Sequence, residues 1–161
     1  MADLRYTGQA ARSNLLGISV PRASAVLPAT ATTTPYFTVS GGLVYITSLI
    51  GICTAAGDAT ATTLLFSAVP TVGAANNMCG ASASLASAVI GQLVSVDGTA
   101  ISTALQAGGV TTGGNIGGMV KPIVVGIGTI DAVTANTNAT LAYRWRLTYI
   151  PIDDGAAVVA A

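Results

Sequence analysis

Residues 141–150 constrain the fold more than any other segment of this sequence. The large apolar residues there fall at every second position, at Leu141, Tyr143, Trp145, Leu147 and Tyr149, with Arg144 and Arg146 among the residues between them. Successive side chains of a β-strand point to opposite faces, so this period of two predicts a strand with one buried face.

Shorter β-branched and aromatic segments precede that strand and are separated by turn residues. They are residues 37–39, 43–47, 62–69, 89–96, 101–105, 120–125 and 127–133. Gly41-Gly42 indicates a hairpin turn or a bulge, Asp97-Gly98 indicates a tight hairpin, and residues 74–87 permit a short helix. Strands spaced by about ten residues predict an all-β fold, an antiparallel β-sandwich that is jelly-roll-like.

Residues 1–35 differ from the rest of the chain. They contain Arg5, Arg12 and Arg22, half of the six basic residues, and finish in a run of Pro, Ala and Thr. A segment of this kind has no hydrophobic period and becomes ordered only against a partner. We therefore predict an extended N-terminal arm over 1–35, a β-sandwich domain over 36–152 and a C-terminal tail over 153–161.

The ionisable residues exclude several kinds of function. The chain has no His and no Glu, so we predict that it is not an enzyme and that it holds no metal or other cofactor. Its formal net charge is zero, which disfavours binding to nucleic acid. The glycine-rich segment 108–118 lacks the phosphate-loop pattern, because Pro122 and not Ser or Thr follows Lys121. We predict that this segment is an exposed loop and that the chain binds no small-molecule substrate.

Charge is also scarce in this chain. Charged residues make up 7% of the sequence and hydrophobic residues 52%, which indicates a subunit that covers part of its surface in an assembly. Uncharged stretches are interrupted before about eighteen apolar residues accumulate, so we expect no membrane-spanning helix. The apolar run before Pro21 is too short for a signal-peptide core. Cys53 and Cys79 are expected to be buried free thiols.

Arg144 and Arg146 share one face of the predicted strand over 141–150. On that face they either extend into solvent or clamp a carboxylate or the surface of a partner subunit. They are therefore candidate subunit contacts.

Three segments together resemble a known family. They are PYFTVSGG at 35–42, VYITSLIG at 44–51 and WRLTYIPIDDGA at 145–156. In this combination the chain is similar to the small head decoration, or cement, proteins of tailed bacteriophages. The likeness covers roughly residues 35–158 and consists of strand and turn patterns.

The resemblance implies a virion protein that forms a homotrimer on the outer capsid surface after assembly in the host cytoplasm. It implies that the chain binds the major capsid protein and catalyses no reaction. It also implies that neither nucleic acid nor a membrane is a partner. We expect the arm to contact the capsid through Arg5, Tyr6, Arg12, Leu15, Leu16, Ile18 and Arg22. An alternative is a head-fibre or tail β-module that contacts a host-surface glycan, with the glycine-rich loop at its tip.

Overall fold

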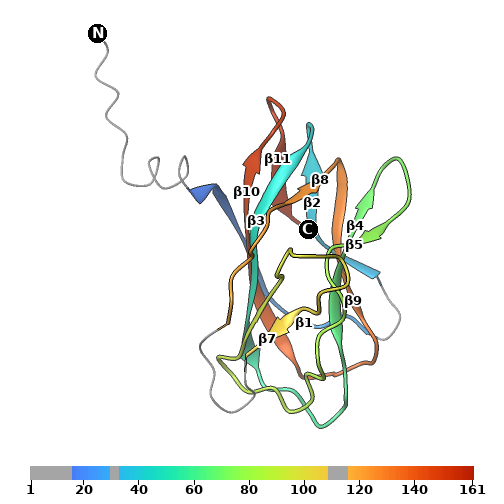
Figure 1. Ribbon diagram of the computed structural model, residues 1–161. Coiled ribbons are helices and arrows are strands. Elements are labelled where there is room, and N and C mark those ends of the chain that lie inside the picture. Colours follow the sequence, from blue (N-terminus) through green and yellow to red (C-terminus); the bar gives the residue numbers. More distant parts are fainter. Residues whose placement is uncertain (1–15, 30–32, 109–115) are drawn as a thin grey trace.

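The computed structural model of this protein describes residues 16–29, 33–108 and 116–161, and its elements there are β-strands. The strands are β1 (Ile18–Val26), β2 (Thr33–Ser40), β3 (Val44–Ala55), β4 (Leu64–Pro70), β5 (Asn76–Asn77), β6 (Leu93–Ser95), β7 (Gln106–Ala107), β8 (Ile123–Val125), β9 (Gly128–Thr134), β10 (Ala142–Pro151) and β11 (Ala157–Ala160). Figure 1 shows that they form two facing layers. The predicted all-β sandwich is confirmed.

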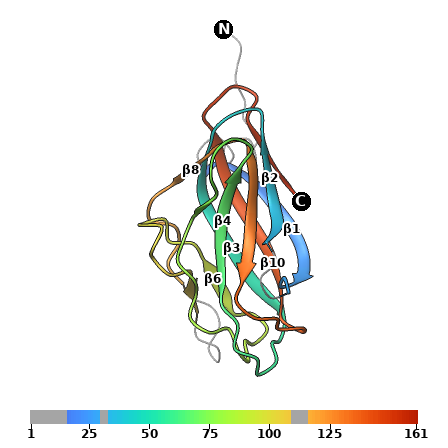
Figure 2. The ribbon, with the colours of Figure 1, turned by 90° about the vertical axis from the view of Figure 1, so that its right-hand side faces the viewer.

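The first layer, sheet A, has the strand order β1-β10-β3-β6-β7, and β8 also pairs with β3. The second layer, sheet B, has the order β11-β2-β9-β4-β5. All pairs between these strands are antiparallel. Figure 2 looks onto the faces of the sheets, with β4 in front of β3 and the long strands running along the molecule.

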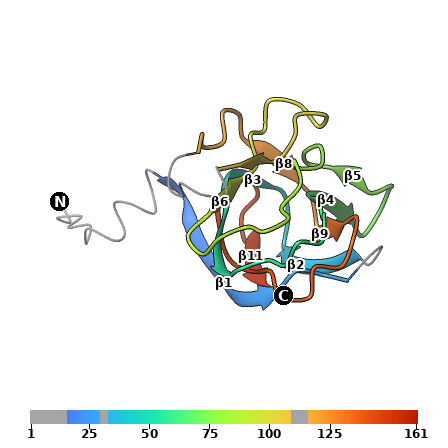
Figure 3. The same ribbon diagram turned by 90° about the horizontal axis from the view of Figure 1, so that it is seen from below.

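The connectivity is that of a jelly roll. Strands from the first part of the chain pair with strands from the last part in nested order, β1 with β10, β2 with β9 and β3 with β8, and β4 pairs with β5 at the centre of this ribbon. The nested ribbon is divided between two sheets, which is the arrangement of jelly-roll folds. In the view from below, β1 of sheet A lies beside β2 and β11 of sheet B and closes one side of the sandwich (Figure 3).

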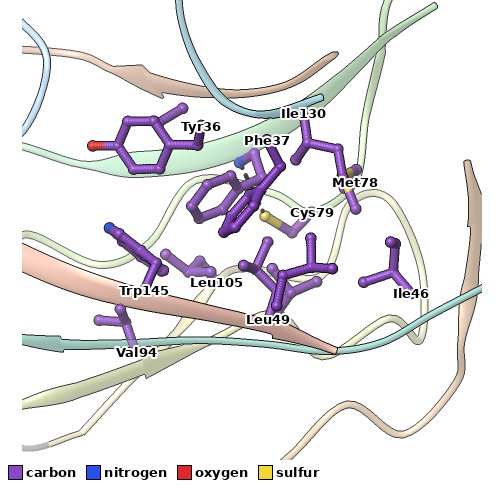
Figure 4. Close-up of a cluster of buried hydrophobic side chains, with 14 of the residues drawn as sticks. Tyr36, Phe37, Ile46, Leu49, Met78, Cys79, Val94, Leu105, Ile130 and Trp145 are labelled. Carbon is purple, nitrogen blue, oxygen red and sulfur yellow. Dashed lines mark hydrogen bonds between the residues drawn. The ribbon is translucent and has the colours of Figure 1, made fainter. Parts of the chain in front are cut away.

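Aromatic side chains from both sheets fill the centre of the sandwich. Trp145 packs edge-on against Phe66 and Tyr36, with ring centroids 4.9 and 5.9 Å apart. Figure 4 shows Tyr36 and Trp145 beside Leu49, Leu105 and Val94 in this cluster. Gly51 of β3 leaves the space that the Trp145 ring occupies, because a Cβ there would lie 2.6 Å from Cζ3 of the indole.

Both ends of the chain join the sandwich, which corrects the predicted boundaries. Ile18–Val26, placed in the arm 1–35 by the sequence analysis, is β1 and pairs with β10 along its length. Ala157–Ala160, placed in the tail 153–161, is β11 and pairs with β2. Both are edge strands, with one open side, and edge positions tolerate Pro21 and weak alternation.

Two predicted turns join different partners from those expected. Gly41-Gly42 connects β2 in sheet B to β3 in sheet A, so it crosses between the layers and forms no hairpin. After Asp97-Gly98 the chain returns to pair only at β7, where Gln106 lies opposite Ser95. The Asp97 carboxylate instead accepts hydrogen bonds from Thr99 N (3.0 Å) and Gln106 Nε2 (2.6 Å), which stabilises a wide loop.

The region 74–87 contains β5 and irregular backbone, and no helix among its residues, all of which the structure describes. Its backbone groups bond to the edge of sheet B instead. Met78 N donates to Phe66 O at 2.8 Å and Ser82 N donates to Leu64 O at 2.9 Å. These contacts with β4 stabilise an extended course along the sheet.

Candidate functional site

The outer face of sheet A combines arginine and apolar side chains. On β10, Tyr143, Trp145, Leu147 and Tyr149 are buried, whereas Arg144 and Arg146 are exposed, as the alternation predicted. The neighbours of these arginines across the sheet are apolar, since Arg144 pairs with Ile52 and Arg146 with Ile50. An antiparallel sheet with one face in water usually carries polar residues on that face. Here the face is largely apolar around two guanidinium groups.

A groove of about 370 Å³ lies on this face. It is lined by Pro21, Arg22, Ile50, Ile52, Leu93, Arg144, Trp145 and Arg146. Three arginines and several aliphatic side chains therefore share one depression, and none of the lining residues is acidic. We call it the arginine groove.

Arg22 links the arginine groove to the core. Its guanidinium carbon lies 3.9 Å from the centroid of the Tyr36 ring, a cation–π contact, and its position on β1 pairs with Trp145. Burial raises the pKa of Tyr36 to about 12, and the nearby positive charge of Arg22 partly offsets that rise. The sequence analysis assigned Arg22 to the arm, whereas the structure brings it to Arg144 and Arg146.

Three polar atoms between the two sheets are buried without a hydrogen-bond partner among the residues that the structure describes. They are Arg22 Nε, Trp145 Nε1 and the Tyr36 hydroxyl. Figure 4 shows the Tyr36 hydroxyl and the Trp145 indole nitrogen on the same side of the aromatic cluster. A buried donor without an acceptor costs about 1 to 3 kcal/mol, so these atoms reduce the stability that the aromatic packing provides.

A row of exposed apolar side chains crosses the same face nearer the end of β10. Tyr45 of β3 lies between Val124 of β8 and Ile150 of β10, and these side chains are 42%, 51% and 41% exposed. We call Tyr45, Val124 and Ile150 the apolar row. Val124 and Ile150 are both cross-strand neighbours of Tyr45, so the three side chains form a continuous apolar strip.

Leu16 and Ile18 lie at the start of β1, at the edge of sheet A. Ile18 pairs with the buried Tyr149, so its side chain lies on the opposite side of the sheet from Ile150, and a Cβ on Gly17 would lie only 2.6 Å from Tyr149 O. The side chains of Leu16 and Ile18 are both exposed. The predicted capsid-contact residues Arg5, Tyr6, Arg12 and Leu15 lie outside the described residues.

The turn between β10 and β11 carries exposed acidic residues. Asp153 Oδ2 accepts a hydrogen bond from Leu43 N at 2.7 Å, which fixes this turn against the start of β3. Ile152 and Asp154 are exposed beside it. Both Asp153 and Asp154 are open to solvent.

The two cysteines are buried and free, as predicted. Burial raises the pKa of both thiols, which keeps them protonated and unreactive at neutral pH. Within residues 16–29, 33–108 and 116–161, no group of three or more His, Cys, Asp or Glu side chains could hold a metal ion. No helix in this part of the chain is long and apolar enough to cross a membrane.

The apolar residues that β3 contributes to these surfaces were not predicted from the sequence. Ile50, Ile52 and Tyr45 belong to a strand in which apolar residues occupy both faces, since Leu49 and Cys53 alternate with them and are buried. A strand that is apolar on both faces is typical of sheets covered on both sides. That signal could have identified the outer face of β3 as an apolar surface.

No match was found in three comparisons of this chain with known proteins, one with protein-family models, one with curated proteins and one with solved structures.

Proposed function

We propose that this chain is a capsid decoration, or cement, protein of a tailed bacteriophage. In this role it binds the outer capsid surface of the virion as a homotrimer and stabilises the lattice of the major capsid protein. The proposal begins from the resemblance of residues 35–42, 44–51 and 145–156 to such proteins. The jelly-roll connectivity agrees with it, because coat proteins of viruses are among the proteins that use this fold.

The apolar row carries the proposal. An isolated sandwich gains nothing from exposing Tyr45, Val124 and Ile150 in one strip, because each apolar side chain kept in water forgoes about 25 cal/mol per Å² of burial. Exposed apolar strips of this kind mark interaction surfaces. The strip is rigid, since it spans three hydrogen-bonded strands.

The position of the N-terminal segment also supports this role. Leu16 and Ile18 are exposed apolar side chains at the start of β1, and β1 pairs with β10, the strand that contributes Ile150 to the apolar row. We propose that Arg5, Tyr6, Arg12 and Leu15 extend this surface over the capsid, together with Leu16 and Ile18. Three such segments in one trimer raise the effective concentration of each remaining segment once the first is bound.

Capsids assembled from the major capsid protein of the same virus, without this chain, provide the test. The full-length chain should sediment with these capsids and raise the temperature at which they disassemble. The variant Tyr45→Ser/Val124→Ser should bind at least about tenfold more weakly, because it removes the central part of the apolar row.

The control is Val159→Ser, which removes an apolar side chain of similar exposure from β11 of sheet B. It should bind capsids like the wild type. A wild-type chain that does not sediment with the capsids would contradict the proposed function, and equal binding by the double variant would exclude the apolar row as the contact.

A further inference from the structure

The chemistry of the arginine groove specifies what it can bind. Arg22, Arg144 and Arg146 line it together with Ile50, Ile52 and Leu93. Guanidinium groups pair most favourably with carboxylates, in a bidentate geometry that two parallel N–H groups provide. The aliphatic walls favour a carboxylate carried beside apolar side chains over a small hydrated ion.

The charges that the groove presents to a partner are those of Arg144 and Arg146, which are exposed on β10. The Arg22 side chain instead turns towards the core, over the Tyr36 ring. A polypeptide segment with an acidic side chain beside an apolar one complements two guanidinium groups and aliphatic walls.

This chain presents such a segment itself. Among the residues that the structure describes, Asp97 and Asp131 are buried and the Asp58 carboxylate accepts a hydrogen bond from Thr60 N in its own turn. The exposed acidic residues of this part of the chain are Asp153 and Asp154, and the exposed side chain of Ile152 precedes them. Asp153 is engaged by Leu43 N, so the Asp154 carboxylate is the one available to a partner.

The turn of one protomer cannot reach its own arginine groove. Arg146 lies in the middle of β10, five residues before Pro151, where that strand ends. At about 3.4 Å per residue this part of the strand spans roughly 17 Å, and the turn is held at its far end by the Leu43–Asp153 hydrogen bond. The complementary groups must therefore come from two different copies.

We propose that the arginine groove is a self-association site that receives the β10–β11 turn of a second copy. Asp154 of one protomer pairs with Arg146 and Arg144 of the next, and Ile152 packs against Ile50 and Ile52. The contact is heterologous, because groove and turn are different surfaces, and such a contact forms a closed trimer when successive copies are related by a threefold rotation. The site rests on the homotrimer of the proposed function and supplies its interface.

A charge exchange tests this pairing. Sedimentation equilibrium over a range of protein concentrations measures the trimer dissociation midpoint for the full-length wild type, Arg146→Asp, Asp154→Arg and the double variant Arg146→Asp/Asp154→Arg. Each single variant should raise the midpoint concentration at least about tenfold, because like charges then face one another. The double variant should restore association to within about threefold of the wild type, because it recreates the pair with opposite polarity.

The matched control is Lys121→Asp, which changes the net charge by the same amount as Arg146→Asp at an exposed position outside the groove lining. It should associate like the wild type, and all variants should show the wild-type unfolding temperature at dilutions where each is monomeric. A monomeric wild type, single variants that associate normally, or a double variant without recovery would each overturn the proposal.

Capsid binding by the same variants separates this inference from the proposed function. A wild type that forms the charge-dependent trimer but ignores capsids supports the self-association site and contradicts the decoration role. A wild type that decorates capsids while the single variants remain trimeric contradicts the self-association site alone.

Discussion

The inner and outer faces of sheet A are formed by alternate residues of the same strands, but only the inner face is covered within one chain. On the inner face, Trp145 packs against Phe66 and Tyr36 from sheet B. On the outer face, Arg146 and Ile50 lie opposite one another beside an open groove. Alternation along a strand therefore indicates which side chains enter the core, whereas the composition of the other face varies independently of it.

The largest loss in the free energy of unfolding should follow from truncating Trp145 on the inner face. Trp145→Ala removes the ring that contacts both sheets and leaves a cavity in the aromatic cluster, so the free energy of unfolding should fall by about 3 to 5 kcal/mol. Urea unfolding followed by far-ultraviolet circular dichroism measures this loss. An unchanged unfolding midpoint would place Trp145 outside the core.

A smaller effect should follow from adding one methyl group to the inner face. Gly51→Ala places a Cβ 2.6 Å from the Trp145 ring, which is closely packed and has little room to move, so overpacking should cost about 1 to 3 kcal/mol. Gly126→Ala is the control, because its Cβ would meet Leu43 at an ordinary 3.7 Å. Thermal unfolding of the two variants should differ clearly, and equal midpoints would show that the indole has space to shift.

Alkaline pH should lower the free energy of unfolding through Tyr36, which packs on the inner face. Its folded-state pKa of about 12 lies above the value of about 10 for a free tyrosine, so the stabilisation is present below pH 10 and is lost as the pH rises towards 12. Between pH 10 and 11 this group should contribute a loss of about 1 kcal/mol in the free energy of unfolding.

Tyr36→Phe isolates that contribution. The variant should have a shallower pH dependence above pH 10 and should unfold near the wild-type midpoint at pH 7, because the Tyr36 hydroxyl has no hydrogen-bond partner to lose among the described residues. Burial also raises the pKa of Tyr143, so some alkaline dependence remains in the variant. Identical pH profiles for the two proteins would refute the role of Tyr36.

The smallest effect on the stability of a single chain should come from the outer face. Arg144→Ala/Arg146→Ala should change the free energy of unfolding by less than about 0.5 kcal/mol at dilutions where the chain is monomeric, because both side chains are exposed. Urea unfolding under these conditions tests this expectation. A loss as large as that of Trp145→Ala would show that the two faces contribute equally to folding.

Local patterns predicted the strands that have one clearly buried face. In β10, Tyr143, Trp145 and Leu147 are buried where the alternation placed them, and the segments 62–69 and 127–133 overlap β4 and β9. These predictions succeed because burial against the opposite sheet imposes a period of two on the residues themselves. The edge strands β1 and β11 were missed, since an edge strand with little core contact needs no such period.

The candidate surfaces depended on contacts that no local pattern contains. Arg22 was grouped with the N-terminal arm because it follows Arg5 and Arg12 in a segment without periodicity. It reaches Arg144 and Arg146 only because β1 pairs with β10 across more than a hundred residues of chain. The apolar row likewise requires β8, β3 and β10 to lie side by side.

The sequence by itself determined that this chain folds into antiparallel strands with an apolar interior, because alternation and turn residues act between near neighbours along the backbone. Only the tertiary structure decided which strands became neighbours. The choice of β1 and β3 as the two partners of β10 rests on backbone hydrogen bonds, which every residue except proline can form on both sides. Strand order is selected by how the whole set of side chains fills the space between the sheets, and that selection brought Arg22, Arg144 and Arg146 into one groove.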